Sequence, residues 1–167
     1  HPNAAPKQEE KEPIQPPQHQ DKQPGEEKQM TPKPISIFDF YQGSGKLKNK
    51  VALITGGDSG IGRAVAYHFA KEGADIVVSY LNEHDDANET KDYIEKLGQK
   101  CLLISGDLTN PEHCQQIIEK TMADFKKLDC LVNNAAEQHR TLAIEDISFD
   151  QLEQIFKVNF FSAFYLT

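Results

Sequence analysis

The chain has 167 residues, with 26 Asp and Glu against 18 Lys and Arg, and a formal net charge of −8 at pH 7. This acidic balance argues against nucleic acid as the main partner, and no apolar run approaches the roughly 20 residues that span a bilayer. Three widely spaced cysteines predict neither a disulfide framework nor a metal site, so we expect a cytoplasmic protein without metal or membrane partner.

The first 34 residues predict an arm rather than a folded core. They hold eight of the nine prolines, and such a segment cannot bury enough apolar surface to offset its ordering entropy. The segment from Ile35 to Tyr41 is more apolar, and two interpretations stay open: it docks on a neighbouring subunit, or it packs on its own domain. We assign residues 1–45 to a disordered or extended arm and 46–167 to a folded domain. The chain begins with His1 rather than Met, which leaves open whether a leader was removed.

From residue 50 the pattern alternates between strands and helices. The predicted strands are Val51–Thr55, Asp75–Tyr80, Cys101–Ser105 and Leu128–Val132. The predicted helices are about Ile61–Glu72, His84–Leu97, one from Asn110 and one from Ser148 to the chain end, with capping boxes at Thr109-x-x-Glu112 and Ser148-x-x-Gln151. This order predicts an α/β fold, a doubly wound parallel sheet of the Rossmann-like type, incomplete in this chain.

A glycine-rich turn joins the first strand to the first helix. Glycines let the backbone approach a phosphate, and a helix start offers free N–H groups, so the turn suits the pyrophosphate of a dinucleotide. The spacing also approaches that of a nucleotide-triphosphate loop, but Arg63 and Ala64 replace the Lys and hydroxyl that such a loop requires. An ordinary turn without a ligand stays open as the alternative.

Four segments, in the order found here, resemble the short-chain dehydrogenase/reductase family. They are Thr55-Gly-Gly-Asp-Ser-Gly-Ile-Gly62, Gly106-Asp107-Leu108, Asn133-Asn134-Ala135-Ala136 and Lys157-Val158-Asn159. Ala136 departs from the family pattern, which has Gly there. The Pro/Gln-rich front end resembles a bacterial general-stress and glucose-dehydrogenase-like branch.

The resemblance implies a dinucleotide-binding domain over residues 46–167, with a site built from several segments. Those expected around the pyrophosphate and adenosine ribose are Gly56, Asp58, Ser59, Gly60, Ile61, Gly62, Leu81 and Asn82. Asp107 and Leu108 are expected at the adenine, and Asn133, Ala135 and Ala136 at the nicotinamide-side ribose. Alternatively, Asp107 is a turn or capping residue. The Asn133-Asn134 pair is alternatively a structural turn that ties the fourth strand to its neighbours, an interpretation compatible with cofactor binding.

The choice between NAD and NADP rests on charge. Tyr80 lies where NAD-preferring family members usually have Asp, and Leu81 where many NADP-preferring members have Arg, so neither marker is present. Asp58, with no base at Ser59, disfavours an extra phosphate, and Arg63 is the one nearby cation. Together, these charges favour NAD over NADP by a small margin.

The family's reaction is hydride transfer between a nicotinamide cofactor and a carbonyl or secondary alcohol. Asn159 matches its catalytic asparagine, and the helical spacing predicts that Asn159 lies buried on the apolar face of the last helix; a mid-helix Asn that bonds locally is the alternative. The catalytic Ser and Tyr-x-x-x-Lys have no counterpart, since Tyr67-x-x-x-Lys71 lies in the first helix, away from the nicotinamide. We therefore expect an N-terminal portion of a longer polypeptide. The resemblance also implies a homo-oligomer, tetramer or dimer.

Two other interpretations of function remain: a dinucleotide sensor without catalysis, and a cofactor-using epimerase or dehydratase. The segments His84-Asp85-Asp86 and His113-Cys114 carry metal-ligand residue types. Adjacent helical residues point in different directions, so we expect both to be solvated surface.

Overall fold

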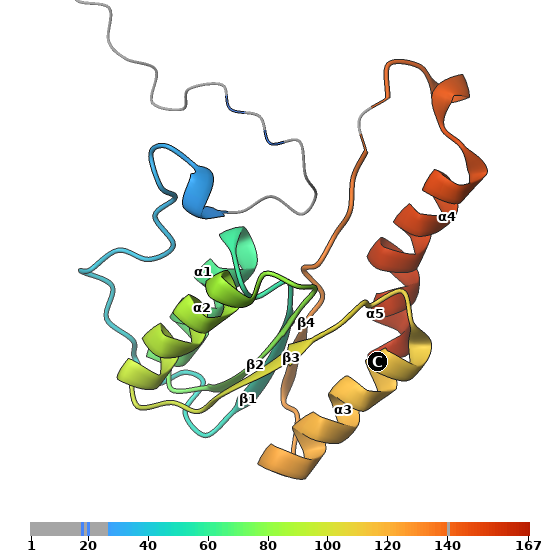
Figure 1. Cartoon of the computed structure of the whole chain (residues 1–167). Coiled ribbons are helices and arrows are strands. Elements are labelled where there is room, and N and C mark those ends of the chain that lie inside the picture. Colours follow the sequence, from blue (N-terminus) through green and yellow to red (C-terminus); the bar gives the residue numbers. More distant parts are fainter. Residues whose placement is uncertain (1–17, 19, 21–26, 140) are drawn as a thin grey trace, which may run out of the picture.

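The computed structural model describes Gln18, Gln20 and residues 27–139 and 141–167, in which strands and helices alternate as predicted (Figure 1). The strands are β1 (Val51–Thr55), β2 (Asp75–Tyr80), β3 (Cys101–Ser105) and β4 (Cys130–Val132). The helices are α1 (Gly60–Lys71), α2 (His84–Lys96), α3 (Pro111–Phe125), α4 (Phe149–Phe156) and α5 (Ser162–Tyr165). Short 3-10 turns span Glu27–Gln29 and Ile144–Asp146, and a π-helical turn, Lys157–Phe161, links α4 to α5.

The four strands form one parallel sheet in the order β3-β2-β1-β4. The chain leaves β1 toward β2 and β3, then crosses back to place β4 on the other side of β1. This reversal is a topological switch point, where parallel α/β sheets form a crevice beyond the carboxyl ends of their strands. The α/β, Rossmann-like fold predicted from the sequence is confirmed.

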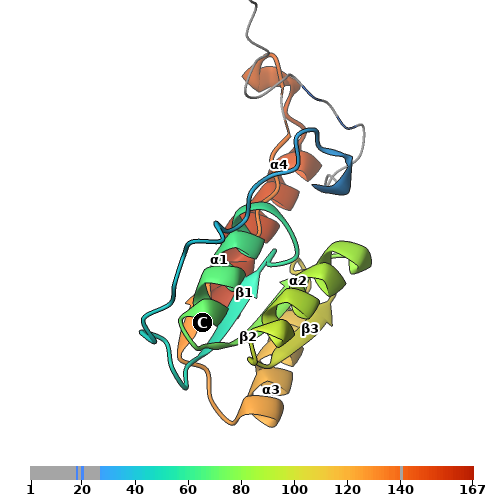
Figure 2. The same ribbon diagram turned by 90° about the vertical axis from the view of Figure 1, so that its left-hand side faces the viewer.

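Helices cover both faces of the sheet (Figures 1 and 2). On one face, α1 and α2 pack against alternate strand residues such as Ile54, Ile76 and Val78. On the other, α3 packs against Leu53 and Val77 through residues that include Ile117. A strand that is buried on both faces has apolar residues at nearly every position, which explains the mainly apolar sequences of β1 and β2. No helix in the described ranges combines the length and apolarity that a membrane crossing requires.

Three local predictions were wrong. The N-cap of α3 is Asn110, whose side chain accepts hydrogen bonds from the backbone N–H groups of Glu112 and His113, so Thr109 does not form the predicted capping box. Strand β4 begins at Cys130 rather than Leu128. The last helix is not continuous, because the π-helical turn interrupts it. The predicted Ser148 cap of α4, in contrast, is confirmed by the 3.1 Å hydrogen bond from Gln151 N–H to Ser148 Oγ.

Residues 27–46 run beside α1 from its N-terminal to its C-terminal end (Figures 1 and 2). Ile37 packs against the core on the α1–α2 face, so this part of the chain contacts its own domain. Residues 1–17, 19 and 21–26, which belong to the same predicted arm, lie outside the described residues.

The C-terminal end of α1 holds the arm through one carboxylate. Glu72 accepts hydrogen bonds from Tyr41 OH at 2.5 Å, from Ser44 N–H at 2.9 Å and from Lys46 N–H at 3.0 Å. The Tyr41 hydroxyl, followed by the two backbone N–H groups, lowers the pKa of Glu72 from its usual 4.5 to about 2.

We expect a stability contribution from Glu72 that depends on pH. Because its pKa is lowered in the folded state, the contribution is fully present above pH 4.5 and is lost as pH falls toward about 2. The difference in free energy of unfolding between the wild-type full-length protein and Glu72→Gln should therefore shrink across this range in urea denaturation. Glu95→Gln, on the exposed surface of α2, is the control; a wild-type-to-E72Q difference independent of pH would contradict the assignment.

Candidate functional site

A cavity of about 420 Å³ lies at the carboxyl ends of the four strands. Its walls come from the turns that follow β1, β2, β3 and β4, together with one side of α4 and the π-helical turn. The lining residues are Gly56, Asp58, Ser59, Ser79, Tyr80, Leu81, Glu83, Gly106, Asp107, Leu108, Asn134, Ala135, Ala136, Glu137, Gln154 and Val158. The cavity therefore occupies the crevice that the strand order creates.

The β1–α1 turn requires glycine at two positions. Gly56 has a φ of +61°, a left-handed conformation that side chains rarely adopt. At Gly62, a Cβ atom would lie 1.9 Å from the Gly56 carbonyl oxygen and 2.7 Å from Asn134 Nδ2. The first turn of α1 thus packs directly on the backbone of the β1–α1 turn and on the Asn134 side chain of the segment after β4.

Asn134 and Thr55 join the β1–α1 turn to the segment after β4. Asn134 Nδ2 donates to the carbonyl oxygens of Thr55 at 2.9 Å and Gly56 at 3.1 Å. Thr55 Oγ1 accepts from the backbone N–H groups of Asn134 and Ala135, each at 3.0 Å. Asn134 lies within the stretch from Asn133 to Ala136 predicted at the site, although it was not singled out there. The structural-turn interpretation of the Asn133-Asn134 pair is confirmed.

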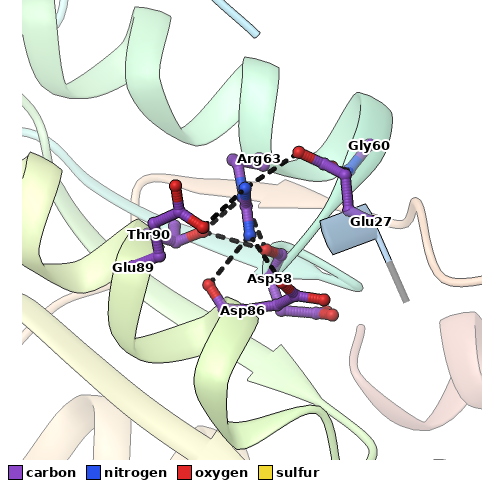
Figure 3. A network of polar contacts seen from close by, with 7 residues as sticks. All are labelled: Glu27, Asp58, Gly60, Arg63, Asp86, Glu89 and Thr90. Atoms are coloured by element: carbon purple, nitrogen blue, oxygen red, sulfur yellow. Dashed lines mark hydrogen bonds and ion pairs between the residues drawn. The ribbon is translucent and has the colours of Figure 1, made fainter. Parts of the chain in front are cut away.

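Behind the β1–α1 turn, the buried side chain of Arg63 makes several polar contacts (Figure 3). Its Nε donates to the Asp58 carbonyl oxygen at 2.8 Å and to Thr90 Oγ1 at 3.0 Å. Its guanidinium forms ion pairs with Glu27 at 2.9 Å and Asp86 at 3.4 Å, and a further one at 3.4 Å with the more exposed Glu89.

Glu27 also binds the turn itself. Its Oε2 accepts a 2.6 Å hydrogen bond from Gly60 N–H, the first residue of α1. No local pattern predicts this contact, because 33 residues separate the two partners.

Two features of the cavity wall bear on ligand binding. Burial raises the pKa of the Asp58 carboxyl above its usual value, with further contributions from Glu83 and Asp86. The buried Ser79 hydroxyl has no hydrogen-bond partner among the described residues. An unpartnered hydroxyl beside a glycine turn fits a ligand rich in hydroxyl and phosphate oxygens, such as a dinucleotide.

The cavity brings together some of the predicted cofactor residues and leaves out others. Those on its walls are Gly56, Asp58, Ser59, Leu81, Asp107, Leu108, Ala135 and Ala136. Those outside the lining are Gly60, Ile61, Gly62, Asn82 and Asn133. Ile61 is 78% exposed, and the Gly60 N–H donates to Glu27.

Asp107 and Asn159 each hold a backbone segment. Asp107 Oδ1 accepts from Thr109 N–H at 2.8 Å, so the turn interpretation is confirmed while the residue also lines the cavity. Asn159 lies in the π-helical turn and is exposed, so its predicted burial was wrong. Its amide accepts from Glu137 N–H at 2.8 Å and donates to the Glu137 carbonyl oxygen at 3.0 Å, which rules out purely local bonding. π-helical insertions occur frequently at functional sites.

The prediction of solvated surface at the metal-ligand residue types holds for the exposed His84 and Asp85 but is wrong for Asp86 and Cys114. Asp86 is 4% exposed and pairs with Arg63, and Cys114 of α3 is fully buried in the core.

Tyr67 stacks on Tyr93 with ring centroids 4.0 Å apart, and Lys71 Nζ donates to the Tyr41 carbonyl oxygen at 2.9 Å. Tyr67 and Lys71 therefore have structural contacts away from the cavity.

The chain is similar to known proteins over most of its length. The model of the family described as short chain dehydrogenase matches residues 50–167. The oxidoreductase YhdF of Bacillus subtilis (strain 168) is 59% identical over 92% of this chain and 53% of its own length. The glucose and ribitol dehydrogenase of Daucus carota is 41% identical over 90% of this chain and 54% of its own.

A solved short chain dehydrogenase from Burkholderia cenocepacia J2315, in complex with NADP, superposes with a TM-score of 0.69 at 31% identity. The match covers 72% of this chain and 49% of that one. The chain thus spans about half the length of the proteins it matches. Because the family model accounts for the whole sheet and the cavity at its edge, this chain belongs to the short-chain dehydrogenase family.

Proposed function

We propose that the full-length protein is a cytoplasmic, homo-oligomeric oxidoreductase that transfers a hydride between a nicotinamide dinucleotide and a carbonyl or secondary alcohol substrate. The observation that carries the proposal is the cavity at the switch point of the sheet, walled by the β1–α1 turn and by the predicted residues from three further strand ends. Ligands of doubly wound sheets bind at this position.

Within this proposal, each wall of the cavity has a role. The β1–α1 turn, with Asp58 and Ser59, binds the pyrophosphate and adenosine ribose; Asp107 and Leu108 contact the adenine; and Ala135 and Ala136 contact the nicotinamide-side ribose. The bound cofactor supplies the hydride chemistry. Asn159 is the proposed catalytic residue of this chain, and its two hydrogen bonds to the Glu137 backbone support a position beside the nicotinamide end of the cavity.

We further propose NAD as the preferred cofactor. Arg63, the cation nearest the β1–α1 turn in the sequence, is buried and paired with Glu27 and Asp86, so it does not offer its charge to a 2′-phosphate. Asp58 and Glu83 add carboxylates to the same wall of the cavity. The Burkholderia relative was solved in complex with NADP. A preference for NADP is therefore the alternative that cofactor titration must distinguish from the proposed preference for NAD.

A single substitution should shift this preference. Leu81→Arg places a cation on the cavity wall, and we expect about tenfold tighter NADPH binding with NADH binding little changed, since only NADPH carries the additional phosphate. Fluorescence titration of the full-length protein measures both affinities. Met122→Arg adds the same charge on α3, at a site of nearly equal exposure (42% against 43%), as a control. Equal gains for both cofactors would contradict the proposed position of Leu81.

The proposed activity is tested by titrating full-length protein with NADH and NADPH and then screening glucose, ribitol and simple aldehydes for cofactor-coupled turnover. We expect submillimolar cofactor binding and turnover of at least one carbonyl or alcohol. Binding without any turnover would favour a dinucleotide sensor. Substrate conversion with no net change in NADH would favour an epimerase or dehydratase.

A further inference from the structure

The arm places a buried carboxylate at the start of the helix that follows the glycine turn. Glu27 is 7% exposed. Its Oε2 accepts from Gly60 N–H at 2.6 Å and its Oε1 accepts from Arg63 Nη1 at 2.9 Å (Figure 3). Both oxygens of a single side chain therefore bind α1, one through its backbone and one through a buried cation.

The contact continues from Arg63 into the wall of the cavity. Arg63 Nε donates to the Asp58 carbonyl oxygen at 2.8 Å, and Thr90 Oγ1 donates to the same oxygen at 3.0 Å. Asp58 and Ser59 line the 420 Å³ cavity, whereas Glu27 and Arg63 line a separate cavity of about 230 Å³. Glu27 thus supports the β1–α1 turn from behind and does not occupy the space in front of it.

The arm is fixed at its other end as well. Glu72, at the C-terminal end of α1, binds Tyr41, Ser44 and Lys46, and Ile37 packs on the core between the two ends. The position of Glu27 is therefore set by the described part of the arm.

We propose that Glu27 is a positioning residue for the cofactor: its carboxylate holds the segment Asp58–Gly60 in the conformation that binds the dinucleotide. This inference rests on the proposed function. Loss of the carboxylate removes the acceptor of Gly60 N–H and one buried partner of Arg63, so the turn loses its support on the side away from the cavity. An opposing effect exists, because a carboxylate at a helix N-terminus weakens the local attraction for a phosphate. Salt screens a buried charge little, so Glu27→Gln, which removes the charge but keeps one acceptor, separates the two effects: NADH binding tighter than in the wild type would show that the charge outweighs the positioning.

The test compares full-length wild type with Glu27→Ala, Glu27→Gln and the control Glu89→Gln. Glu89 contacts the same guanidinium, but its side chain is 58% exposed. We expect Glu27→Ala to raise the KM and Kd for NADH about tenfold while kcat at saturating cofactor and the substrate KM stay unchanged. Glu27→Gln, which keeps one carbonyl acceptor, should give an intermediate value, and Glu89→Gln the wild-type value.

The expected changes in KM, Kd and kcat distinguish a positioning role of Glu27 from a role in overall stability alone. A residue that only stabilised the fold would lower the amount of active protein, which reduces apparent kcat at unchanged KM, and thermal unfolding of each variant reports that loss directly. Should Glu27→Ala fail to fold, Glu27→Gln carries the test alone. Wild-type NADH affinity in a folded Glu27→Ala or Glu27→Gln protein would overturn the inference by itself. A wild-type protein that binds neither NADH nor NADPH would overturn the proposed function together with it.

Discussion

Replacing Arg63 by Met is expected to lower the free energy of unfolding of the full-length protein by about 3–5 kcal/mol. Arg63 is 4% exposed and links the arm, the β1–α1 turn and α2. Its removal leaves Glu27 and Asp86, both nearly fully buried, without their cation. An uncompensated buried charge is the largest part of the expected loss.

Two further variants test this explanation of the Arg63 effect. Glu89→Gln removes only the exposed partner and should change stability by less than about 1 kcal/mol, the usual range for surface ion pairs. Adding Glu27→Gln and Asp86→Asn to Arg63→Met removes the stranded carboxylates, so the triple variant should recover most of the lost stability. Urea denaturation measures all of these values; equal losses for Arg63→Met and Glu89→Gln would show that the buried network does not stabilise the protein.

Replacing Gly62 by Ala is expected to weaken cofactor binding at least about tenfold, the equivalent of 1.4 kcal/mol. The new Cβ would lie 1.9 Å from the Gly56 carbonyl oxygen, a backbone atom that cannot move aside without shifting the turn. Overpacking of this kind lowers the free energy of unfolding by about 1–3 kcal/mol. Here it also pushes α1 away from the β1–α1 turn, which forms a wall of the cavity. Titration of the full-length protein with NADH measures the loss.

The control for this substitution is Gly98→Ala. Gly98 has a φ of +83° and open space around its Cβ position, at the far end of α2 from the cavity. The Gly98→Ala substitution should lower stability because alanine rarely adopts a positive φ, but it should leave the NADH affinity unchanged. A Gly62→Ala protein that binds NADH like the wild type would show that close packing of α1 on the turn has no part in cofactor binding.

The sequence predicted the sheet well because its two central strands, β1 and β2, are buried on both faces. Val51–Thr55, Asp75–Tyr80 and Cys101–Ser105 were predicted at their observed bounds, since each is a mainly apolar run next to a glycine, a polar turn or both. Strand β4, one of the two edge strands, pairs with β1 through only three residues. Its start was misplaced because the apolar Leu128 lies outside the strand, although it looks like a strand residue in the sequence.

The cavity wall was predicted only where residues follow a strand directly. Gly56, Leu81, Asp107 and Ala135 were found in this way. Ser79, buried within β2, was missed because an interior strand residue carries no local sign that it faces a ligand.

Contacts between residues far apart in the sequence could not be predicted from the sequence. The pairing of Glu27 with Gly60 and Arg63 joins the predicted arm to the first helix, and no periodicity or spacing relates them. The exposure of Asn159 was missed for a related reason: a regular helix was assumed, whereas the π-helical turn shifts the face on which the side chain lies.

The most direct measurement is a crystal structure of the full-length protein with bound NAD. We predict that the pyrophosphate oxygens lie within hydrogen-bond distance of backbone N–H groups in the turn between Thr55 and Gly62, other than that of Gly60, which Glu27 already binds. The adenine should lie beside Asp107. A dinucleotide bound elsewhere on the molecule, with the β1–α1 turn in contact only with protein atoms, would contradict the account.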